Sequence, residues 1–412
     1  MTNNGTKDMH VLIVGAGTSG LLIAQGLKKA SVPFTIFESE STSTYQTRPR
    51  EWGMTLHWGS SHIQSCLPDD LVARFSEAYA DPAQDPNATT GLPIYNGKTG
   101  EIIMEMAADK PCRVSRKKMR NLFSEGLDVQ YGKELKSAEV GMNGKVKIEF
   151  ADGTSATGEV LVGCDGAKSR VRTSICGPEV AKLTDVPVSM FNFPYKFDAE
   201  LAKRIRDMNK LFITSIHPDH GTMFWLSIQD VPDPNNPSTW TFQVLQSWVD
   251  DTVPSSVDLS TFGGRMAFFK QRSEEWAEPW RSAGRAVAAD TKLPLDKGTY
   301  WEKSTKWDNR AGRMTLCGDA AHPMTPHRGQ GLNNALQDSA NFVAAIGKVQ
   351  SGKKSLQEAV EEYDAEVLER GTLEMQISLK QTLFVHNWET LMQSPMVKMG
   401  MHQAKKEHAV GA

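Results

Sequence analysis

The sequence predicts an α/β fold built on a parallel β-sheet, with an inserted, mainly antiparallel sheet and helices toward the C-terminus. The first observation is a short apolar run at 10–14, followed by helical spacing at 18–30 and a second apolar run at 34–38. A strand, a helix and a strand in this order form a βαβ unit, which belongs to parallel sheets. The other two observations are alternating apolar residues in the middle third and two helical patterns near the end.

The strands after the βαβ unit are predicted in chain order. Residues 145–150 alternate between apolar and polar, and Asp152-Gly153 supplies the turn of a hairpin. A continuous apolar run at 160–163 predicts another buried strand. The segments at 223–228 and 239–245 alternate, which predicts antiparallel strands of a second sheet.

Two helices are predicted near the C-terminus, at 333–346 and 356–373. In the second helix, the apolar residues fall on one face, which is more typical of core packing than of a groove for a partner. These residues are Leu356, Val360, Tyr363 and Val367.

Composition excludes several classes of protein. A net charge of −3 over 412 residues gives no reason to expect nucleic acid or an anionic membrane as partner. The five cysteines are scattered without a C-x-x-C pair, which favours free thiols in a reducing compartment over disulfides or a metal site. Residues 1–8 are polar, and no apolar stretch is long enough to span a bilayer. We therefore expect a cytoplasmic protein without a membrane span or metal ligands.

A glycine-rich loop joins the first strand to the first helix. Residues 15–20 read Gly-Ala-Gly-Thr-Ser-Gly, the G-x-G-x-x-G pattern of dinucleotide sites. Gly15 permits a tight turn, Gly17 lets a pyrophosphate approach the backbone, and Gly20 allows close packing of helix on strand. Glu38 ends the second strand, where a carboxylate accepts hydrogen bonds from ribose hydroxyls. This pattern alone does not separate FAD from NAD.

Two further segments bring charge to the ends of elements. The strand at 160–163 leads to Asp165-Gly166, where glycine turns the backbone, and Arg170 and Arg172 follow with positive charge. Arg116 begins a basic helical pattern after Val114-Ser115. A solvated basic face is the structural alternative for these arginines, because most arginines lie at the surface.

The most informative segment is the run 315–335. It reads as a strand end, an acidic residue in Gly318-Asp319, a loop stiffened by Pro323 and Pro326, and a glycine-started helix at 329–331. A carboxylate accepts hydrogen bonds from hydroxyl groups, and a helix N-terminus stabilises a delocalised anion. The run therefore predicts a site for an oxygen-rich organic cofactor.

In this order, the four segments resemble the motifs of the flavoprotein aromatic hydroxylases, the single-component (group A) FAD-dependent monooxygenases. The resemblance covers about residues 11–345 and departs from the usual pattern at Cys164, where the family usually has alanine. It implies a Rossmann-like FAD-binding domain like that of para-hydroxybenzoate hydroxylase. It also implies that Asp319 accepts a hydroxyl of the ribityl chain and that the backbone at 329–331 lies at the pyrimidine edge of the flavin. The expected FAD-binding residues are Gly15, Gly17, Thr18, Ser19, Gly20, Glu38, Arg116, Asp165, Gly318, Asp319, Gly329, Gln330, Gly331, Leu332 and Asn333.

The resemblance further implies a division of the chain. The FAD-binding domain is expected in three parts, with an excursion on the substrate side, a substrate-binding β-sheet domain and C-terminal helices. The expected parts of the FAD-binding domain are 8–80, 111–185 and 295–350. The excursion is expected at 81–110, the sheet domain at 186–294 and the helices at 351–412.

The chemistry implied by the resemblance is oxygenation of a small molecule by non-covalently bound FAD. NAD(P)H reduces the flavin, O2 adds at its C4a carbon, and the hydroperoxide delivers one oxygen atom. The loop at 327–331, His-Arg-Gly-Gln-Gly, is similar to the loop of fungal enzymes of secondary metabolism that act on medium-sized metabolites. Hydroxylation, epoxidation and Baeyer–Villiger insertion share these motifs, and a flavin oxidase on the same fold stays open. A redox-sensing regulatory flavoprotein is the alternative from another class, and the sequence leaves the oligomeric state open.

Three residues are candidates for the chemistry at the substrate. His327 and Arg328 stand in the loop before the glycine-started helix, where relatives commonly carry apolar or small residues. A histidine there can orient substrate or take a phenolic proton, because its pKa lies near the working pH. Arg50 can hold an anionic or phenolate substrate. The alternatives are a His-Arg pair that hydrogen-bonds loop carbonyls and an exposed loop arginine.

Overall fold

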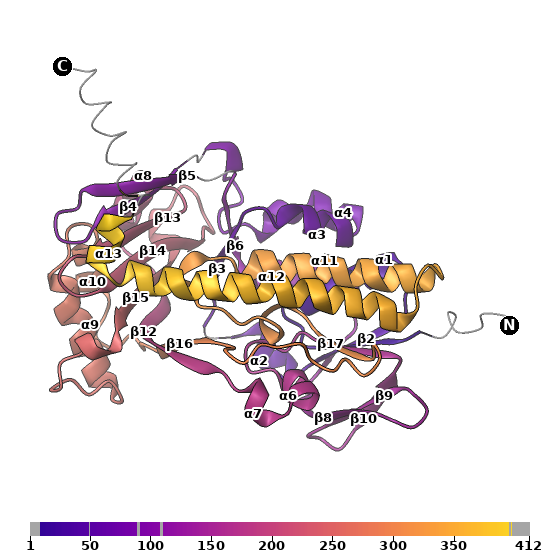
Figure 1. Ribbon diagram of the computed structural model, residues 1–412. Coiled ribbons are helices and arrows are strands. Elements are labelled where there is room, and N and C mark those ends of the chain that lie inside the picture. The colour runs from indigo at the N-terminus through magenta and orange to yellow at the C-terminus, as the bar shows by residue number, and fades with distance from the viewer. Residues whose placement is uncertain (1–8, 49, 89–90, 108–109, 395–396, 398–412) are drawn as a thin grey trace.

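The computed structural model describes residues 9–48, 50–88, 91–107, 110–394 and 397 (Figure 1). Residues 1–8, the polar segment noted in the sequence, lie outside this part of the chain. Among the described helices, none is both long and apolar enough to cross a membrane. All five cysteines are free, as the sequence predicts.

A five-stranded parallel sheet forms the first part of the molecule, in the order β17-β11-β1-β2-β7. The predicted βαβ unit is confirmed, because β1 pairs in parallel with β2 and α1 connects them. Strands β1 and β11 are buried at every residue, which agrees with their continuous apolar sequence. The elements are β1 (Val11–Val14), α1 (Thr18–Lys29), β2 (Phe34–Glu38), β7 (Val129–Tyr131), β11 (Val160–Gly163) and β17 (Met314–Leu316).

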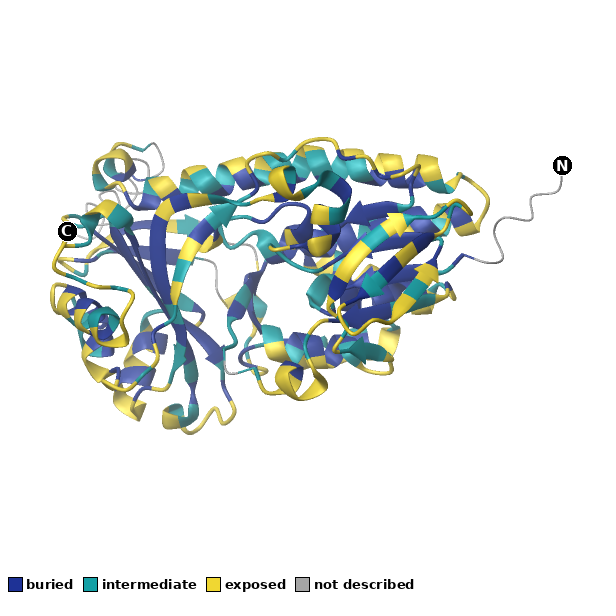
Figure 2. Cartoon of the chain, turned by 90° about the horizontal axis from the view of Figure 1, so that it is seen from below, coloured by how far each residue is buried: buried dark blue, intermediate teal, exposed yellow. Residues whose placement is uncertain are grey.

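A seven-stranded sheet forms the second part, in the order β16-β12-β15-β14-β13-β4-β5. All of its pairs are antiparallel except β13 with β4, so the prediction of a mainly antiparallel sheet is confirmed. Figure 2 shows its long strands largely in the colour of buried residues. The strands are β4 (Gly91–Asn96), β5 (Ile102–Ala107), β12 (Thr184–Tyr195), β13 (Phe212–His217), β14 (Thr222–Asp230), β15 (Thr241–Val249) and β16 (Leu295–Tyr300).

The alternation along the long strands separates two faces of this sheet. In β15, Phe242, Val244 and Trp248 pack in one core cluster with residues of the helices that cover this face. Leu245, between them in sequence, belongs to another cluster with Val385 and Leu391 near the C-terminus. These covering helices are α8 (Ala199–Met208), α9 (Phe262–Glu274) and α10 (Trp280–Ala286).

Smaller sheets and short helices complete the fold. Strands β3 and β6 form a two-stranded antiparallel sheet, and β8, β9 and β10 form a three-stranded one. The strands are β3 (Gly53–Leu56), β6 (Cys112–Ser115), β8 (Leu135–Val140), β9 (Val146–Phe150) and β10 (Ser155–Gly158). The shorter helices are α2 (Thr42–Gln46), α3 (Ser60–Cys66), α4 (Asp69–Ala73), α5 (Arg116–Ser124), α6 (Arg170–Cys176) and α7 (Pro178–Ala181), with the 3₁₀ turns η5 (Gly318–Ala320) and η6 (Pro326–Arg328).

Two long helices, α11 (Gly331–Gln350) and α12 (Leu356–Val385), lie side by side, and α12 reaches from the parallel sheet to the seven-stranded sheet (Figure 1). The second begins at the predicted residue, where Ser355 and Glu358 form a capping box. It is longer than the sequence analysis expected, because its later buried positions include Ser378 and Thr382, which an apolar pattern does not mark. A short helix, α13 (Trp388–Gln393), follows. The α/β fold with an inserted antiparallel sheet and C-terminal helices is therefore confirmed.

Candidate cofactor-binding site

A cleft of about 590 Å³ opens at the carboxyl ends of the parallel strands. It collects segments that are far apart in the sequence: the loop after β1, the end of β2, the start of α5, the loop after β11 and the start of α11. Ligands of α/β sheets bind at this edge. The expected cofactor residues in its lining are Gly15, Gly17, Thr18, Ser19, Glu38, Arg116, Asp165, Asp319, Gly331 and Leu332.

The glycines of the first loop make room in the way the sequence predicts. Gly15 has φ 106°, and a Cβ there would lie 2.3 Å from the carbonyl oxygen of Cys164. A Cβ on Gly20 would lie 2.0 Å from the oxygen of Gly15, whereas nothing lies within 4 Å of one on Gly17. Among the described residues, no side chain caps the start of α1 at Gly17, so its first N–H groups can bind an anion.

Glu38 is held in place at the end of β2. Its Oε2 accepts a hydrogen bond from the backbone N–H of Ala16 (3.0 Å), and its Oε1 accepts one from the N–H of Glu40 (3.0 Å). The residue is buried yet lines the cleft. A carboxylate fixed in this way can accept hydrogen bonds from the hydroxyls of a ribose.

Asp319 lies in η5 and lines the same cleft as Glu38. Its side chain is exposed to the cleft, and within the described part of the chain its carboxylate has no hydrogen-bond or ion-pair partner. Enclosure by protein on the other sides raises its pKa, while the charges of His322 and Arg116 act to lower it. A carboxylate without a partner, facing a cleft, is a ready acceptor for the hydroxyl groups of a ligand.

Asp338 of α11, which sequence reasoning missed, supports the Asp319 loop. Its Oδ2 accepts hydrogen bonds from the N–H of Gly318 (2.7 Å) and from His322 Nε2 (2.6 Å), and its Oδ1 accepts one from Arg370. Asp338 and His322 are both buried. Asp338 stands within a helix, 20 residues after Gly318, and no sequence motif marks it as a partner of that loop.

Asp165 shapes the loop after β11. Its Oδ1 accepts a hydrogen bond from the hydroxyl of Ser169 (2.5 Å), and its Oδ2 accepts from the N–H groups of Arg170 (2.7 Å) and Val171 (3.1 Å). Burial raises the pKa of Asp165, and these hydrogen bonds oppose that effect. Its carboxylate therefore orders the start of α6 at the wall of the cleft.

The two arginines after Asp165 differ in environment. Arg170 is exposed and lines the cleft. Arg172 is buried and donates to the carbonyls of Ala320 (2.8 Å) and Ala181 (3.1 Å), with its guanidinium over the ring of Trp301. Arg172 therefore ties the Asp165 and Asp319 loops together.

Arg116 begins α5 and lies beside the cleft. Its guanidinium stacks over the ring of Trp52, 4.4 Å from the centroid, and lies 3.6 Å from Glu51. Burial lowers its pKa from 12.5 to about 10, so it stays protonated at neutral pH. The positive charge faces the same cleft as the free start of α1, which suits the phosphates of a dinucleotide.

The start of α11 forms part of the wall of the cleft, whereas Gly329 and Gln330 before it do not line the cleft. No side chain in the described part of the chain caps this helix at Gln330, and Gly331 and Leu332 line the cleft. Asn333 turns away from it: its Oδ1 accepts from the N–H of His57 (2.9 Å), and its Nδ2 donates to the carbonyl of Thr55 (3.1 Å). Its side chain thus attaches α11 to β3.

His327 lies in a hydrogen-bonded network that joins the loop before α11 to α12 and β15. Its Nδ1 is 3.0 Å from Thr382 Oγ1, and its Nε2 is 3.1 Å from Ser247 Oγ. Ser247 Oγ also contacts His386 Nε2 at 2.9 Å. Burial holds the pKa of His327 well below its usual range, and the nearby His386 adds to this effect.

The two candidate arginines are already paired. Arg50 forms a two-pronged ion pair with Asp296 of β16 and donates through Nε to the carbonyl of Asn192 (3.0 Å). Arg328 forms an ion pair with Glu374 of α12. Neither of them, nor His327, contributes to the lining of the cleft.

Arg113 in β6 is another charged residue that sequence reasoning missed. It is buried, donates to Thr55 Oγ1 (2.8 Å) and Gln243 Oε1 (3.2 Å), and lies over the ring of Trp225. Within the described residues it has no carboxylate partner, and burial lowers its pKa to about 9. The signal available in the sequence is a charged residue between Cys112 and Val114, two apolar positions of a strand.

The chain is similar to known proteins over nearly its whole length. The family described as "FAD binding domain" matches residues 113–378. The FAD-dependent monooxygenase phnB of Penicillium herquei is 35% identical over 97% of this chain and 98% of its own length. The FAD-dependent monooxygenase cctM of Talaromyces islandicus is 35% identical over 97% of this chain and 98% of its own length.

Solved structures share the fold at lower identity. A putative FAD-containing monooxygenase from Photorhabdus luminescens superposes with a TM-score of 0.76 at 23% identity, covering 92% of this chain and 98% of that one. Klebsiella pneumoniae HpxO, solved with FAD and uric acid, superposes with a TM-score of 0.72 at 19% identity, covering 98% of this chain and 94% of that one. The cleft, with its free helix starts, unpartnered carboxylate and flanking arginine, fits a bound dinucleotide. From the family match and the near full-length relatives, we conclude that this chain belongs to the FAD-dependent monooxygenases and is an oxidoreductase.

Proposed function

We propose that this enzyme uses NAD(P)H and O2 to hydroxylate or epoxidise a medium-sized organic metabolite in fungal secondary metabolism. The observation that carries the proposal is the cleft in which Glu38, Arg116 and Asp319 surround two uncapped helix starts. FAD held there would supply the redox chemistry, through reduction by NAD(P)H and reaction with O2 at its C4a carbon. Free thiols fit a reducing compartment such as the cytoplasm.

Different residues of the cleft would bind different parts of the cofactor. Glu38 would accept the adenosine ribose hydroxyls, and Gly17, with the start of α1 and Arg116, would hold the pyrophosphate. Asp319 would accept a ribityl hydroxyl. The backbone N–H groups at the start of α11 would stabilise negative charge at the pyrimidine edge of the ring.

The substrate would lie between this cofactor and the seven-stranded sheet. His327 stands where the loop before α11 meets that sheet, and its neutral imidazole can orient substrate or accept a proton. Because both ring nitrogens already have hydroxyl partners, proton transfer there would pass through Ser247 or Thr382. Arg50 and Arg328 would act through the carboxylates that they pair with, unless substrate displaces those partners.

The test is oxidation of NAD(P)H by the FAD-loaded protein, with and without candidate aromatic and polyketide-like molecules. The expected result is bleaching of the flavin's visible absorption by NAD(P)H and substrate-dependent uptake of O2. A flavin that no nicotinamide reduces would overturn the monooxygenase proposal in favour of a redox-sensing role. Incorporation of one ¹⁸O atom from ¹⁸O2 would separate oxygenation from oxidase activity. The position of that label would separate two reactions. Baeyer–Villiger insertion places it between a carbonyl carbon and its neighbour, as the new ester oxygen, whereas hydroxylation places it in a hydroxyl group.

A further inference from the structure

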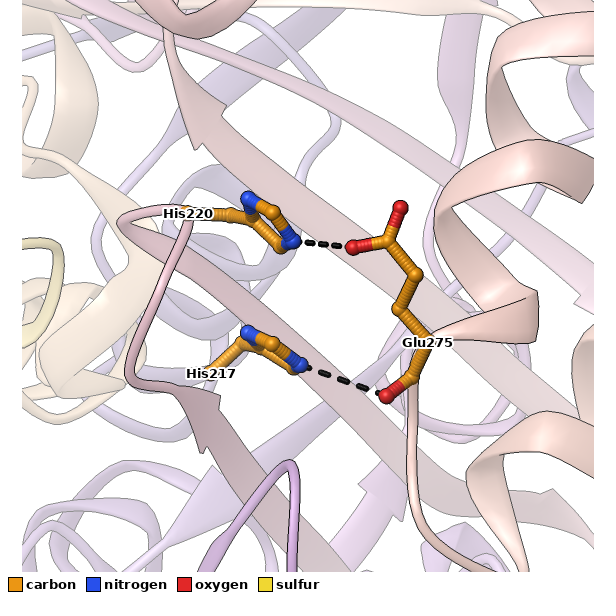
Figure 3. A group of neighbouring side chains, drawn as sticks. All are labelled: His217, His220 and Glu275. Atoms are coloured by element: carbon orange, nitrogen blue, oxygen red, sulfur yellow. Dashed lines mark hydrogen bonds and ion pairs between the residues drawn. The ribbon is translucent and has the colours of Figure 1, made fainter.

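Three side chains of types that bind metals converge at the turn between β13 and β14 of the seven-stranded sheet (Figure 3). His217 ends β13, His220 lies in the turn to β14, and Glu275 follows α9 directly. One ligand atom of each lies within 4.8 Å of the others. Figure 3 shows both imidazoles with the same edge toward Glu275: His220 contacts its carboxylate, and His217 Nε2 lies 3.2 Å from its carbonyl oxygen.

The arrangement is held by its surroundings. The rings of His217 and His220 are stacked, with centroids 4.6 Å apart and planes 17° from parallel. The His217 ring also packs edge-on against Trp276, at 5.3 Å between centroids. Two backbone hydrogen bonds join the elements that carry the three residues through Gly97, which donates to Ile216 O (2.8 Å) and accepts from Ala277 N (2.6 Å). The ligands are thus brought together by the fold.

The group is also open to solvent on one side. The side chains of His220 and Glu275 are 27% and 40% exposed, whereas His217 is buried. A cation can therefore enter between the two exposed side chains and reach the buried one. None of the three contributes to the lining of the cofactor cleft.

We propose that His217, His220 and Glu275 form a site for a divalent cation of the zinc class, with solvent at the fourth position. Two imidazole nitrogens and one carboxylate oxygen are a ligand set that zinc uses at about 2.0–2.2 Å, whereas Mg²⁺ and Ca²⁺ prefer oxygen ligands alone. The scattered cysteines predicted no metal ligands, and a cysteine pattern gives no sign of an H-x-x-H turn that meets a distant glutamate.

Binding requires only local changes. The two imidazole rings must move closer to each other, and the cation replaces the contact between His220 and the Glu275 carboxylate. His217 coordinates through Nε2, so its contact with the Glu275 carbonyl (3.2 Å) is lost and its proton moves to Nδ1. Its contact with the N–H of Asp219, which is long at 3.3 Å, is then lost as well. His220 likewise coordinates through Nε2, so the proton that faces the Glu275 carboxylate moves to Nδ1 of the same ring.

The consequence is structural. A Cβ on Gly221, in the same turn, would lie 2.6 Å from the carbonyl oxygen of His386, so the turn packs directly on the end of α12. A cation would fasten this turn to the end of α9 and thereby support the end of α12. Because the site is separate from the cofactor cleft, it stands independently of the proposed reaction.

The experiment uses tag-free, full-length, FAD-loaded protein, treated with a chelator and then titrated with ZnCl2 alone by calorimetry. We expect one Zn²⁺ per chain and a higher Tm with Zn²⁺, because a ligand of the folded state stabilises it. CoCl2 should give the visible absorption of four-coordinate Co²⁺ with nitrogen and oxygen ligands. The buried His217 is left intact, because its replacement could prevent folding.

The variants His220→Ala and Glu275→Gln test the assignment, with His62→Ala as the control at a histidine elsewhere. We expect at least a tenfold loss of Zn²⁺ affinity and no Tm shift in the first two, and wild-type binding in the control. The absence of stoichiometric Zn²⁺ binding to the wild-type protein, or undiminished binding in both variants, would overturn the proposal. Reduction of FAD by NAD(P)H in the same samples reports separately on the proposed function.

Discussion

Asp338 and His322 form a buried pair, in which Asp338 Oδ2 lies 2.6 Å from His322 Nε2 and also accepts the N–H of Gly318. The pair attaches the loop that carries Asp319 to α11. Replacement of Asp338 by asparagine should lower the free energy of unfolding by about 3–5 kcal/mol, because Arg370 loses its buried partner. Urea denaturation measures this change.

The matched control is Glu366→Gln, which removes the other carboxylate partner of Arg370 at a more exposed position. A partly exposed ion pair contributes about 0–1 kcal/mol, so this variant should stay near wild type. Equal losses in the two variants would contradict a special role for Asp338.

The same pair should give the stability a pH dependence. Burial lowers the pKa of His322, but the charge and hydrogen bond of Asp338 outweigh it and raise the pKa above 6.5. This stabilisation is complete below pH 6.5 and is lost as the pH rises through the raised pKa of the folded state. His322→Gln should therefore flatten the fall in stability above neutral pH, measured by urea denaturation at a series of pH values. An unchanged slope would show that other groups cause it.

For Asp338, burial raises the pKa, but His322 and Arg370 outweigh it and lower the pKa below 3.8. Its stabilisation is present above pH 3.8 and is lost as the pH falls through the lowered value. Wild-type protein should lose stability in acid more steeply than Asp338→Asn. Parallel acid profiles of the two proteins would contradict this assignment.

The parts of the fold that follow a regular pattern were predictable, and those that depend on distant contacts were not. Strands β2 and β11 have the predicted bounds, because continuous apolar runs ending in Glu38 and before Asp165 mark buried parallel strands. The pairing of Arg50 with Asp296 joins residues 246 positions apart, and no local pattern encodes it. Asp338 likewise shows its role only when α11 packs against η5.

Asp319→Ala should weaken FAD binding strongly, because it removes the carboxylate that would accept a hydrogen bond from a ribityl hydroxyl. A hydrogen bond to a charged group contributes about 1.5–3 kcal/mol, which corresponds to a loss in affinity of about 10- to 150-fold. The bound FAD per protein and the dissociation constant of added FAD measure the effect. Asp308→Ala, at an exposed aspartate paired with Arg310, is the control. A variant that purifies with a full complement of flavin would show that Asp319 is not a ligand of the cofactor.

Glu38→Gln should weaken FAD binding less than Asp319→Ala. The glutamine keeps one oxygen that can accept from the N–H of Ala16, but its amide cannot accept from both a backbone N–H and a ribose hydroxyl at the second position. Competition by adenosine diphosphate, which has the ribose but no flavin, should weaken by the same factor as FAD. A selective loss of FAD alone would place Glu38 away from the adenosine half.

His327→Ala should keep FAD but change turnover, because the network around it joins the loop before α11 to the seven-stranded sheet. Burial keeps the imidazole neutral at pH 7, so its ring nitrogens can hold one donated and one accepted hydrogen bond. We expect a lower yield of product per NAD(P)H consumed, with more hydrogen peroxide. Ser247→Ala removes the hydroxyl between His327 and His386 and should reproduce part of this loss of coupling. Ser247→Thr retains a hydroxyl and should keep the yield of product near wild type. Wild-type kinetics and coupling in His327→Ala with the true substrate would leave this histidine a purely structural role.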